Sequence, residues 1–215
     1  MHGIIQGSAE WRAVRLGKVT ASRISDVIAK AARGEYKASR NTYMGQLIAE
    51  RLSGRKAETF VSTEMKWGTE TEPFAREAYE FYMGVSVEQI AFVLHPRISE
   101  AGASPDGLVD ADGLVEIKCP NTVTHLDTIL GESIAQKYVD QMQWQMACTE
   151  RLWCDFVSFD PRLPEEHRLY VQRVDRDPLY IAKLEEEVAG FLLGMSAKLC
   201  ELENRRNRKN GRINQ

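Results

Sequence analysis

The sequence feature that most constrains the fold is the stretch Ser104–Pro120, in which two short apolar runs flank Asp-Ala-Asp-Gly. Such runs on either side of a tight turn predict a β-hairpin, with Gly113 as the left-handed residue of a three-residue loop, residues 111–113. The odd loop length decides which side chains share a face, because a slip of one residue inverts every side chain. With this loop, Asp110 lies opposite Leu114.

The predicted hairpin brings three functional groups to one side of the ribbon. Asp106 lies opposite Lys118, and Glu116 is on the same side. Two carboxylates and the carbonyl of Ile117 suit Mg²⁺, which commonly takes one or two carboxylates and fills its other positions with water and phosphate. Lys118 would favour the deprotonated form of a bound water and offset charge on an attacked phosphorus. The alternative is a solvated hairpin with cross-strand ion pairs.

Length and composition are those of an ordinary globular domain. The chain has 215 residues, 43% hydrophobic and 27% charged, and we place one domain at residues 1–203. No apolar run approaches the roughly 18 residues of a membrane span, and residues 1–6 do not resemble a secretory signal. We therefore expect a cytoplasmic protein with no membrane contact. The four cysteines are scattered, which argues against a zinc or iron–sulfur site.

The net charge of −3 is unevenly distributed. Residues 1–40 hold eight Lys or Arg against three Asp or Glu, a net +5, which leaves −8 for the remainder. A basic N-terminal region can bind phosphates locally while the acidic remainder repels non-specific attachment. Residues 204–215 contain five basic residues and no acid, and predict a disordered, solvated tail, with a DNA or partner contact as the alternative.

Apolar periodicity predicts an α/β fold, a central mixed sheet flanked by helices. Strands are expected in the hairpin and over residues 85–94, 152–159 and 169–174, the first with an irregularity near Gln89. Helices are expected over residues 41–53, 67–82, 122–131, 133–149 and 180–202. The helix over 67–82 carries Trp67, Phe74, Ala78 and Phe81 on one repeat, and the one over 133–149 carries an inward stripe of Tyr138, Met142, Gln145 and Met146.

Two further positions have both a structural and a functional interpretation. Thr20 or Ser22 is predicted to cap a short helix, whose free N–H groups could bind phosphate together with Arg15; a capped helix with a solvated arginine is the alternative. Glu72 falls near the first turn of the helix predicted over 67–82, where a carboxylate commonly stabilises the helix dipole.

Pro105-Asp106, followed after nine residues by Glu116-Ile117-Lys118, matches the P-D-(x)n-(D/E)-x-K pattern of restriction-endonuclease-like nucleases. Further segments agree in order over about residues 11 to 190. They are Trp11–Ser22, Trp67–Glu72, Ser104–Gly107, Glu116–Pro120, Gln141–Trp144 and Phe159–Arg162. Through them the chain resembles the phage lambda exonuclease and YqaJ-type family of viral recombinase nucleases.

The resemblance implies a restriction-endonuclease-like core and a Mg²⁺-dependent 5′-to-3′ exonuclease. Such an enzyme digests one strand from the 5′-phosphorylated ends of linear double-stranded DNA and leaves 3′ overhangs for recombination by strand annealing. A structure- or sequence-specific endonuclease of the same fold, or a non-enzymatic DNA-end-binding scaffold, are the alternatives, since fold alone does not separate them.

The resemblance also assigns roles to residues. Two Mg²⁺ ions, replaceable by Mn²⁺, are implied at Asp106, Glu116 and the Ile117 carbonyl, and Lys118 is implied to activate water. Glu72 is implied to support the metal and Gln141 to orient water or substrate. Three more residues are implied to hold the terminal 5′-phosphate: Arg15, Ser22 and Ser104.

The family also implies an assembly. We expect a homotrimeric ring acting in the bacterial host of a phage or prophage, with a single-strand annealing protein as partner. Closed heterologous contacts would gather the basic N-terminal segments around DNA. The polar loop over residues 31–37 matches a neighbourhood that helps to separate the strands, with Arg33 and Tyr36 as candidate wedge residues.

Overall fold

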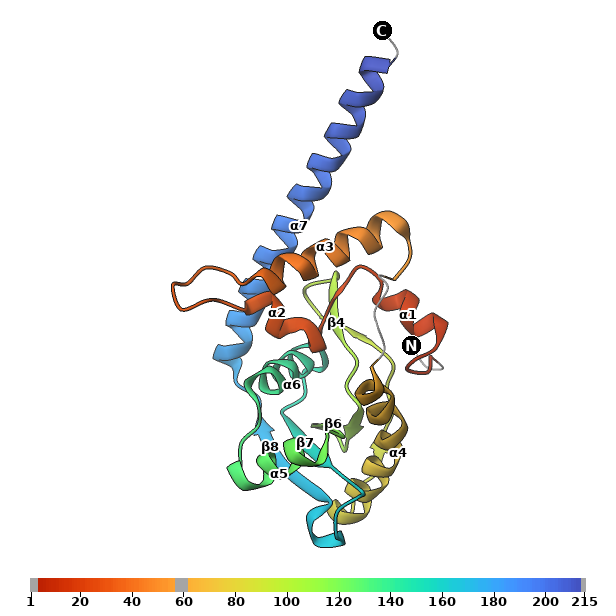
Figure 1. Ribbon diagram of the computed structural model, residues 1–215, viewed down its shortest axis with the longest axis vertical. Helices are drawn as coiled ribbons and strands as arrows, with labels where there is room; N and C mark the ends of the chain where they lie inside the picture. Colours follow the sequence, from red (N-terminus) through yellow and green to blue (C-terminus); the bar gives the residue numbers. More distant parts are fainter. Residues whose placement is uncertain (1–3, 57–61, 214–215) are drawn as a thin grey trace.

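Two mixed β-sheets enclosed by helices make up the computed structural model, which describes residues 4–56 and 62–213 (Figure 1). The helices are α1 (Ala9–Arg15), α2 (Ile24–Ile28), α3 (Ala38–Ser53), α4 (Thr63–Met83), α5 (Thr122–Gly131), α6 (Gln136–Thr149) and α7 (Pro178–Ile213), with 3₁₀ turns η1 (Ala21–Arg23) and η2 (Glu165–His167). The strands are β1 (Val19–Thr20), β2 (Val87–Glu88), β3 (Val93–Leu94), β4 (Ala101–Ala103), β5 (Gly107–Val109), β6 (Gly113–Lys118), β7 (Trp153–Phe159) and β8 (Leu169–Asp175).

The larger sheet has the order β2-β5-β6-β7-β8. Only β6 and β7 pair in parallel, and the chain between them contains α5 and α6, as a parallel connection requires. The other neighbours are antiparallel. The predicted mixed sheet flanked by helices is confirmed.

Strand β6 separates two cores because its side chains alternate between the faces of the sheet. Val115 and Ile117 lie in one buried cluster with Ala75 of α4. Leu114 lies in another with Met142 of α6. The alternation therefore directs residues 114, 116 and 118 of β6 toward α6.

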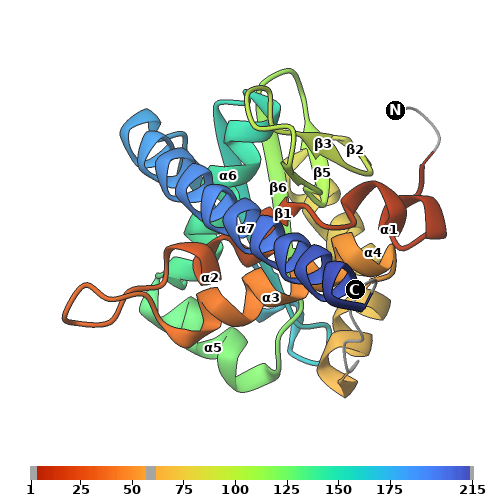
Figure 2. The same ribbon diagram turned by 90° about the horizontal axis from the view of Figure 1, so that it is seen from above.

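The smaller sheet, β1-β4-β3, lies beneath the helices of a third core. Helix α7 crosses over α2 and α3, with which it is in contact (Figure 2). Tyr43 of α3 stacks on Phe191 of α7, and Trp144 of α6 is fully buried in the same cluster. Helix α6 thus contacts both the larger sheet and the third core.

The strand predicted over residues 85–94 is interrupted after Glu88, next to the irregularity predicted near Gln89, and the interruption is a complete break. Its ends, β2 and β3, belong to different sheets. Between them, the carbonyl of Ile90 accepts a hydrogen bond from Gln6 and that of Ala91 accepts one from Trp11, at 2.8 and 2.9 Å. These groups are thus bonded by side chains of the N-terminal segment, where a continuous strand would have bonded a neighbour.

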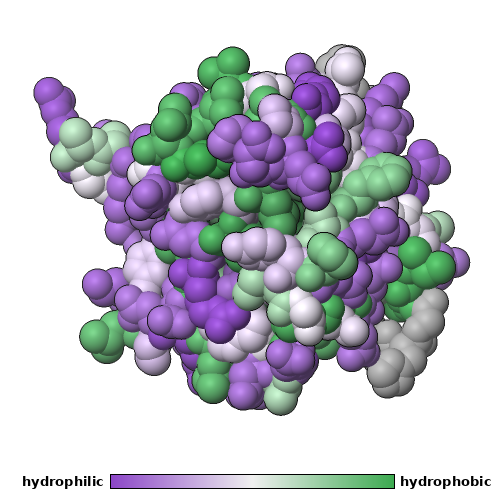
Figure 3. All heavy atoms as spheres, turned by 90° about the horizontal axis from the view of Figure 1, so that it is seen from below, coloured by the Kyte–Doolittle hydropathy of each residue, from purple (hydrophilic) through white to green (hydrophobic). Residues whose placement is uncertain are grey.

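Helix α4 presents a different face to the sheet from the predicted aromatic repeat. Thr71, Ala75 and Tyr79 are buried, whereas Phe74 and Phe81 are 62% and 92% exposed. The small side chain of Ala75 allows the helix to lie close to β6 and β7, which the bulkier phenylalanines would prevent. Figure 3, seen from below, shows apolar residues lying in separate patches among hydrophilic ones.

The C-terminal end also differs from the prediction. Helix α7 continues to Ile213, through the segment expected to be disordered beyond residue 203. Residues 204–210 contain no Gly or Pro, and basic residues near a helix C-terminus interact favourably with its dipole. No helix in the described ranges is both long and apolar enough to cross a membrane.

Candidate active site

The β5–β6 hairpin has the predicted loop length with a shifted register. Val109 pairs with Gly113, so the three loop residues are 110–112, and Asp110 is the left-handed residue with φ 46°. Gly113 is needed for another reason: a Cβ there would lie 2.1 Å from the ring of Trp153. Leu114 pairs with Leu108 in the structure, whereas the prediction paired it with Asp110. The partner has changed by two residues, so each side chain stays on its predicted face.

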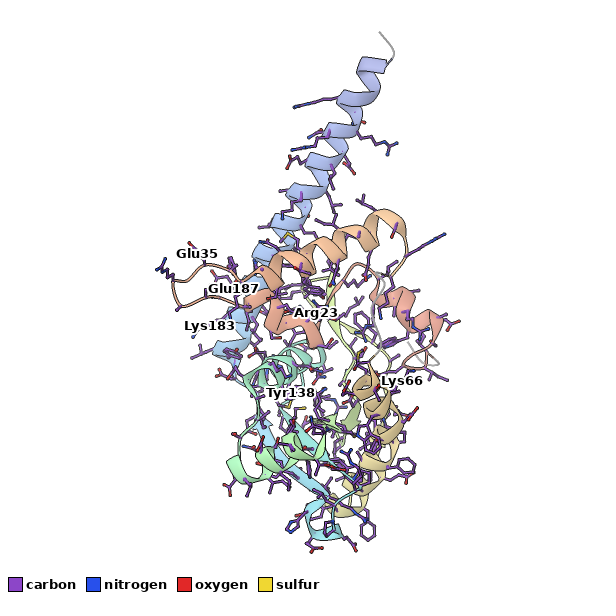
Figure 4. The ribbon with its side chains drawn as sticks, in the orientation of Figure 1. Arg23, Glu35, Lys66, Tyr138, Lys183 and Glu187 are labelled. Carbon is purple, nitrogen blue, oxygen red and sulfur yellow. The ribbon has the colours of Figure 1, made fainter. Side chains whose placement is uncertain are left out.

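The hairpin brings the predicted acidic and basic groups together. The N–H of Ile117 donates to Asp106 Oδ2 at 2.7 Å, and Lys118 Nζ donates to Glu116 Oε1. Lys118 also lies 5.2 Å from the ring centre of Tyr138, which Figure 4 labels on α6. We use the name carboxylate cluster for four residues: Glu72, Asp106, Glu116 and Lys118.

Burial and like charges shift the protonation of this cluster. Burial raises the pKa of Asp106 well above its usual range, and Glu116 raises it further. Burial acts to lower the pKa of Lys118, but Glu116 and Asp106 outweigh it and the pKa is raised. Lys118 is therefore a cation at neutral pH, as the predicted charge-offsetting role requires.

Two glutamines of α6 hold the buried carboxylate of Glu116. Gln141 Nε2 donates to Oε1 at 2.7 Å, and Gln145 Nε2 donates to Oε2 at 2.5 Å. Gln141 thus contacts Glu116, one of the predicted metal ligands. Gln145, which was expected only as a core residue, also belongs to the site. Its spacing of four residues from Gln141 places both side chains on one face of the helix, and this spacing could have indicated its role.

Glu72 lies in the third turn of α4, because the helix begins at Thr63 rather than near Trp67. A stabilising contact with the helix dipole is therefore excluded, since that effect is confined to the first turn. Burial raises the pKa of Glu72; Arg76, which bonds it at 2.5 Å, opposes this, and Glu116 adds to it. Glu72 is thus electrostatically part of the cluster.

The donor set fits a divalent cation without being a complete protein cage. No group of three or more His, Cys, Asp or Glu among residues 4–56 and 62–213 is arranged to hold a metal by itself. Asp106 and Glu116 supply the one or two carboxylates that Mg²⁺ usually takes. The raised pKa of Asp106 shows that a further positive charge would stabilise the ionised cluster.

A second cation, Arg15, lies next to this cluster, because its partner Ser104 is two residues from Asp106. Arg15 Nη1 donates to Ser104 Oγ at 3.3 Å, and its guanidinium lies 3.9 Å from the ring centre of Trp11. Trp11 Nε1 also donates to Ser104 Oγ, at 3.0 Å. Burial lowers the pKa of Arg15 to about 10, so it remains charged at neutral pH. We call these residues the Arg15 pocket: Trp11, Arg15 and Ser104.

Ser22 is placed near this pocket by strand pairing. Strand β1 runs parallel to β4, with Thr20 paired to Gly102, so Ser22 and Ser104 each follow their strand by two or fewer residues. Ser22 is exposed in η1, and Thr20 occupies the N-cap position without a side-chain cap bond. The structure therefore brings Arg15 and Ser104 into contact and leaves Ser22 at the edge.

The candidate wedge residues lie on a projecting loop. The loop closes through a bridge between Lys30 and Tyr36. The Tyr36 hydroxyl donates to Glu187, and the Arg40 guanidinium lies 3.8 Å from the centre of the Tyr36 ring; the hydrogen bond is 2.7 Å long. Figure 4 labels Glu187 on α7 and Glu35 on the loop. Tyr36 therefore anchors the base of the loop to α7, whereas Arg33 is exposed.

Two segments that carried the resemblance meet next to β6. Buried Asp160 accepts from Arg162 Nε and Nη2 at 2.7 and 2.9 Å, and from Thr122 Oγ1 at 2.6 Å. Arg162 lies 4.5 Å from the ring centre of Trp67 and donates to the carbonyl of Pro120 at 3.3 Å. The chain that follows Lys118 is thus tied to both α4 and β7.

A mixed sheet flanked by helices, with this carboxylate–lysine hairpin, is the restriction-endonuclease-like class of fold. The sequence profile of the YqaJ-like viral recombinase domain matches residues 10–152. The chain belongs to the YqaJ-like viral recombinase domain family.

Solved structures agree with this assignment. LHK-Exo, an alkaline exonuclease from Laribacter hongkongensis, is 46% identical over 94% of this chain and 99% of that chain, with a TM-score of 0.88, and its complex with dAMP gives the same values. A phage related exonuclease from Haemophilus somnus 129PT shares the fold, at 17% identity over 86% of this chain and 96% of that one, with a TM-score of 0.71. No curated protein sequence was found to match.

Proposed function

We propose that the protein is a Mg²⁺-dependent 5′-to-3′ exonuclease that digests one strand from the 5′-phosphorylated ends of linear double-stranded DNA. Its products would be 3′ single-stranded overhangs for recombination by strand annealing. The observation that carries this proposal is that Ser104 bonds Arg15, while Asp106, two residues further on, belongs to the carboxylate cluster. A site for a terminal phosphate thus adjoins a site for hydrolysis. The 46% identity to an alkaline exonuclease supports the same reaction.

Within this proposal the cluster residues have distinct roles. Asp106, Glu116 and the Ile117 carbonyl hold divalent cations, which nucleases of this family generally use; Mg²⁺ is proposed, two ions, with Mn²⁺ as a substitute. A bound cation would polarise the phosphate and lower the pKa of a coordinated water. Lys118, a cation, offsets the negative charge of the attacked phosphate. Glu72 adds negative charge for the cation, and Gln141 keeps Glu116 oriented.

The Arg15 pocket would select the substrate end. The planar guanidinium of Arg15 can bond two phosphate oxygens, and Ser104 and Ser22 add hydroxyl donors. Arg15 contacts the Ser104 hydroxyl and the Trp11 ring, and Glu50 helps to keep it charged, so its guanidinium can bind an anion. This contact would place the first phosphodiester at Asp106.

One set of digestions tests the proposal. Linear duplexes with a 5′-phosphate, a 5′-hydroxyl or a labelled 3′ end, and a closed circular duplex, are incubated with and without Mg²⁺. We expect loss of the 5′-phosphorylated strand only, with retention of the 3′ label and of the circle. Cutting of the circle would favour a structure- or sequence-specific endonuclease. Binding of ends without cleavage would favour a scaffold.

We further propose a homotrimeric ring formed by the domain over residues 1–203, acting with a single-strand annealing protein in the cytoplasm of a phage host. A ring would retain DNA between successive cuts and gather the basic N-terminal segments of three copies. Light scattering should report three times the 24.4 kDa chain mass. A monomer that releases DNA after each cut would contradict the ring.

A further inference from the structure

The end of α7 is a second basic region, far in sequence from the first. Residues 204–215 carry +5, with no Asp or Glu. Because the whole chain carries −3 and residues 1–40 carry +5, the residues between, 41–203, carry −13. A strongly acidic body therefore lies between two cationic ends.

The contact of α7 with the body ends at Leu199. Val188, Phe191 and Met195 are fully buried in the core with α2 and α3, and Leu199 is the last residue to pack on it. Residues 200–208 are all exposed, and Figure 1 shows this end of α7 projecting away from the rest of the chain. We call residues 200–213 the C-terminal arm, which is about 21 Å long at 1.5 Å per residue.

The arm has more positive charge than its own acids can balance. Arg205 pairs with Glu201 at 2.5 Å, one helical turn away. Arg206 and Arg208 belong to none of the ion pairs within residues 4–56 and 62–208. Arg205 and Arg208 are three positions apart and therefore lie on one face of the helix. Like charges so spaced repel one another, and a polyanion along this face would remove that repulsion.

We propose that the C-terminal arm binds the phosphate backbone of duplex DNA outside the active site. The inference rests on the proposed function, which makes duplex DNA the substrate. Duplex DNA carries one negative charge per about 1.7 Å when both strands are counted, so an arm of about 21 Å spans a length of duplex that holds roughly a dozen phosphates. Leu202 is the one large exposed apolar residue within 200–208, so charge, rather than an apolar face, recognises the occupant. The contact reads no base sequence.

Two charge-matched, full-length variants test the arm. Arg205→Gln/Arg208→Gln removes two charges from it. Lys183→Gln/Lys198→Gln removes two exposed charges from the part of α7 that precedes the arm. The probe is a closed circular duplex, which offers no end to the active site, and its affinity is measured at constant Mg²⁺ over a series of NaCl concentrations. Circular dichroism verifies that both variants are folded.

The arm variant should show a slope of log affinity against log salt that is shallower by up to about 1.8, because each lost phosphate contact removes about 0.9. The lysine variant should keep the wild-type slope. Digestion of saturating short linear duplex should remain at the wild-type rate in both. A wild-type slope in the arm variant, which is also what an arm reserved for a protein partner would give, overturns the inference, as does an equal change in both variants.

The test separates this inference from the proposed function. Wild-type protein that digests linear DNA, with an arm variant of unchanged slope, overturns the arm alone. Wild-type protein that digests no DNA, with a slope that depends on the arm, overturns the exonuclease proposal and supports the arm.

Discussion

The carboxylate cluster and the Arg15 pocket are neighbours with opposite excess charge: the cluster has three acids and one lysine, and the pocket has one arginine. In the cluster, three acids share one buried environment, and the pKa of Asp106 and of Glu72 is raised. In the pocket, a guanidinium contacts a hydroxyl and an aromatic ring, and burial lowers its pKa to about 10 although Tyr43 and Glu50 oppose this shift. One site is stabilised by a cation and the other by an anion. A divalent ion would supply the positive charge to the cluster, and a terminal phosphate would supply the negative charge to the pocket. Each site is therefore less stable alone than with its ligand.

The largest expected effect comes from removing the one lysine of the cluster. Lys118→Ala should lower the cleavage rate by roughly 10²- to 10³-fold, the range seen when a group that stabilises charge in the transition state is lost. Binding of DNA ends in the presence of Mg²⁺ should persist, because Asp106 and Glu116 are retained. Single-turnover digestion and end binding measure the two effects. Asp106→Ala is the comparison, and should lose both metal binding and activity.

The hydrogen bond from Gln145 is the next contact to remove. Gln145→Leu leaves Glu116 Oε2 without its donor and should weaken Mg²⁺ binding by roughly 10- to 100-fold, as loss of such supporting contacts commonly does. Calorimetric titration with Mg²⁺ measures this. Gln143→Leu is the control, because Gln143 bonds the backbone of residues 175 and 177 instead. It should lower thermal stability and leave Mg²⁺ affinity unchanged.

The Arg15 pocket can be tested independently of the cluster. Arg15→Gln should weaken action on 5′-phosphorylated ends by roughly tenfold to a hundredfold, since a hydrogen bond to a charged group is worth about 1.5–3 kcal/mol. Ends with a 5′-hydroxyl should be affected little. Arg12→Gln, an exposed arginine of the same helix, is the control. An equal loss on both kinds of end would mean that Arg15 has no special contact with the phosphate.

The smallest effect concerns stability in the absence of metal. Asp106 has a folded pKa above its unfolded value, so its ionised form is disfavoured in the folded protein, and stability falls as pH rises from about 4 through the folded pKa. Asp106→Asn should therefore raise the Tm measured in EDTA at neutral pH, by roughly 2–4 °C for each kcal/mol recovered. The gain should disappear at pH 4, and Mg²⁺ should stabilise only the wild type. A lower Tm for the variant at every pH would contradict the electrostatic interpretation.

The parts that the sequence predicted correctly are those set by local spacing. The hairpin, the face shared by Asp106, Glu116 and Lys118, and the bounds of α5 depend on residues close in sequence. The predicted register was wrong by two residues, but the side chains were still assigned to the correct faces, because a shift of two residues restores the same face. Gln145 was missed because apolar periodicity cannot distinguish a buried glutamine that packs from one that bonds a carboxylate.

Features that depend on distant residues were not predictable in this way. The break between β2 and β3 is made by contacts with Gln6 and Trp11, more than 70 residues away. The outward position of Phe81 follows from the close approach of Ala75 to the sheet. Strand β1 has two residues, too few for a pattern, yet its pairing with β4 brings Ser22 toward Ser104.

The pairing of α1 with Ser104 also sets an order of events during synthesis. Trp11 and Arg15 are made early, but their partner Ser104 lies 93 and 89 residues later. The Arg15 pocket therefore cannot form until Ser104 has left the ribosome. Glu116 cannot form its hydrogen bonds with Gln141 and Gln145 until those residues, 25 and 29 positions later, have been synthesised. Partly made chains shorter than about half the protein thus contain neither site in finished form, and nascent chains begin to acquire both only after the hairpin has emerged.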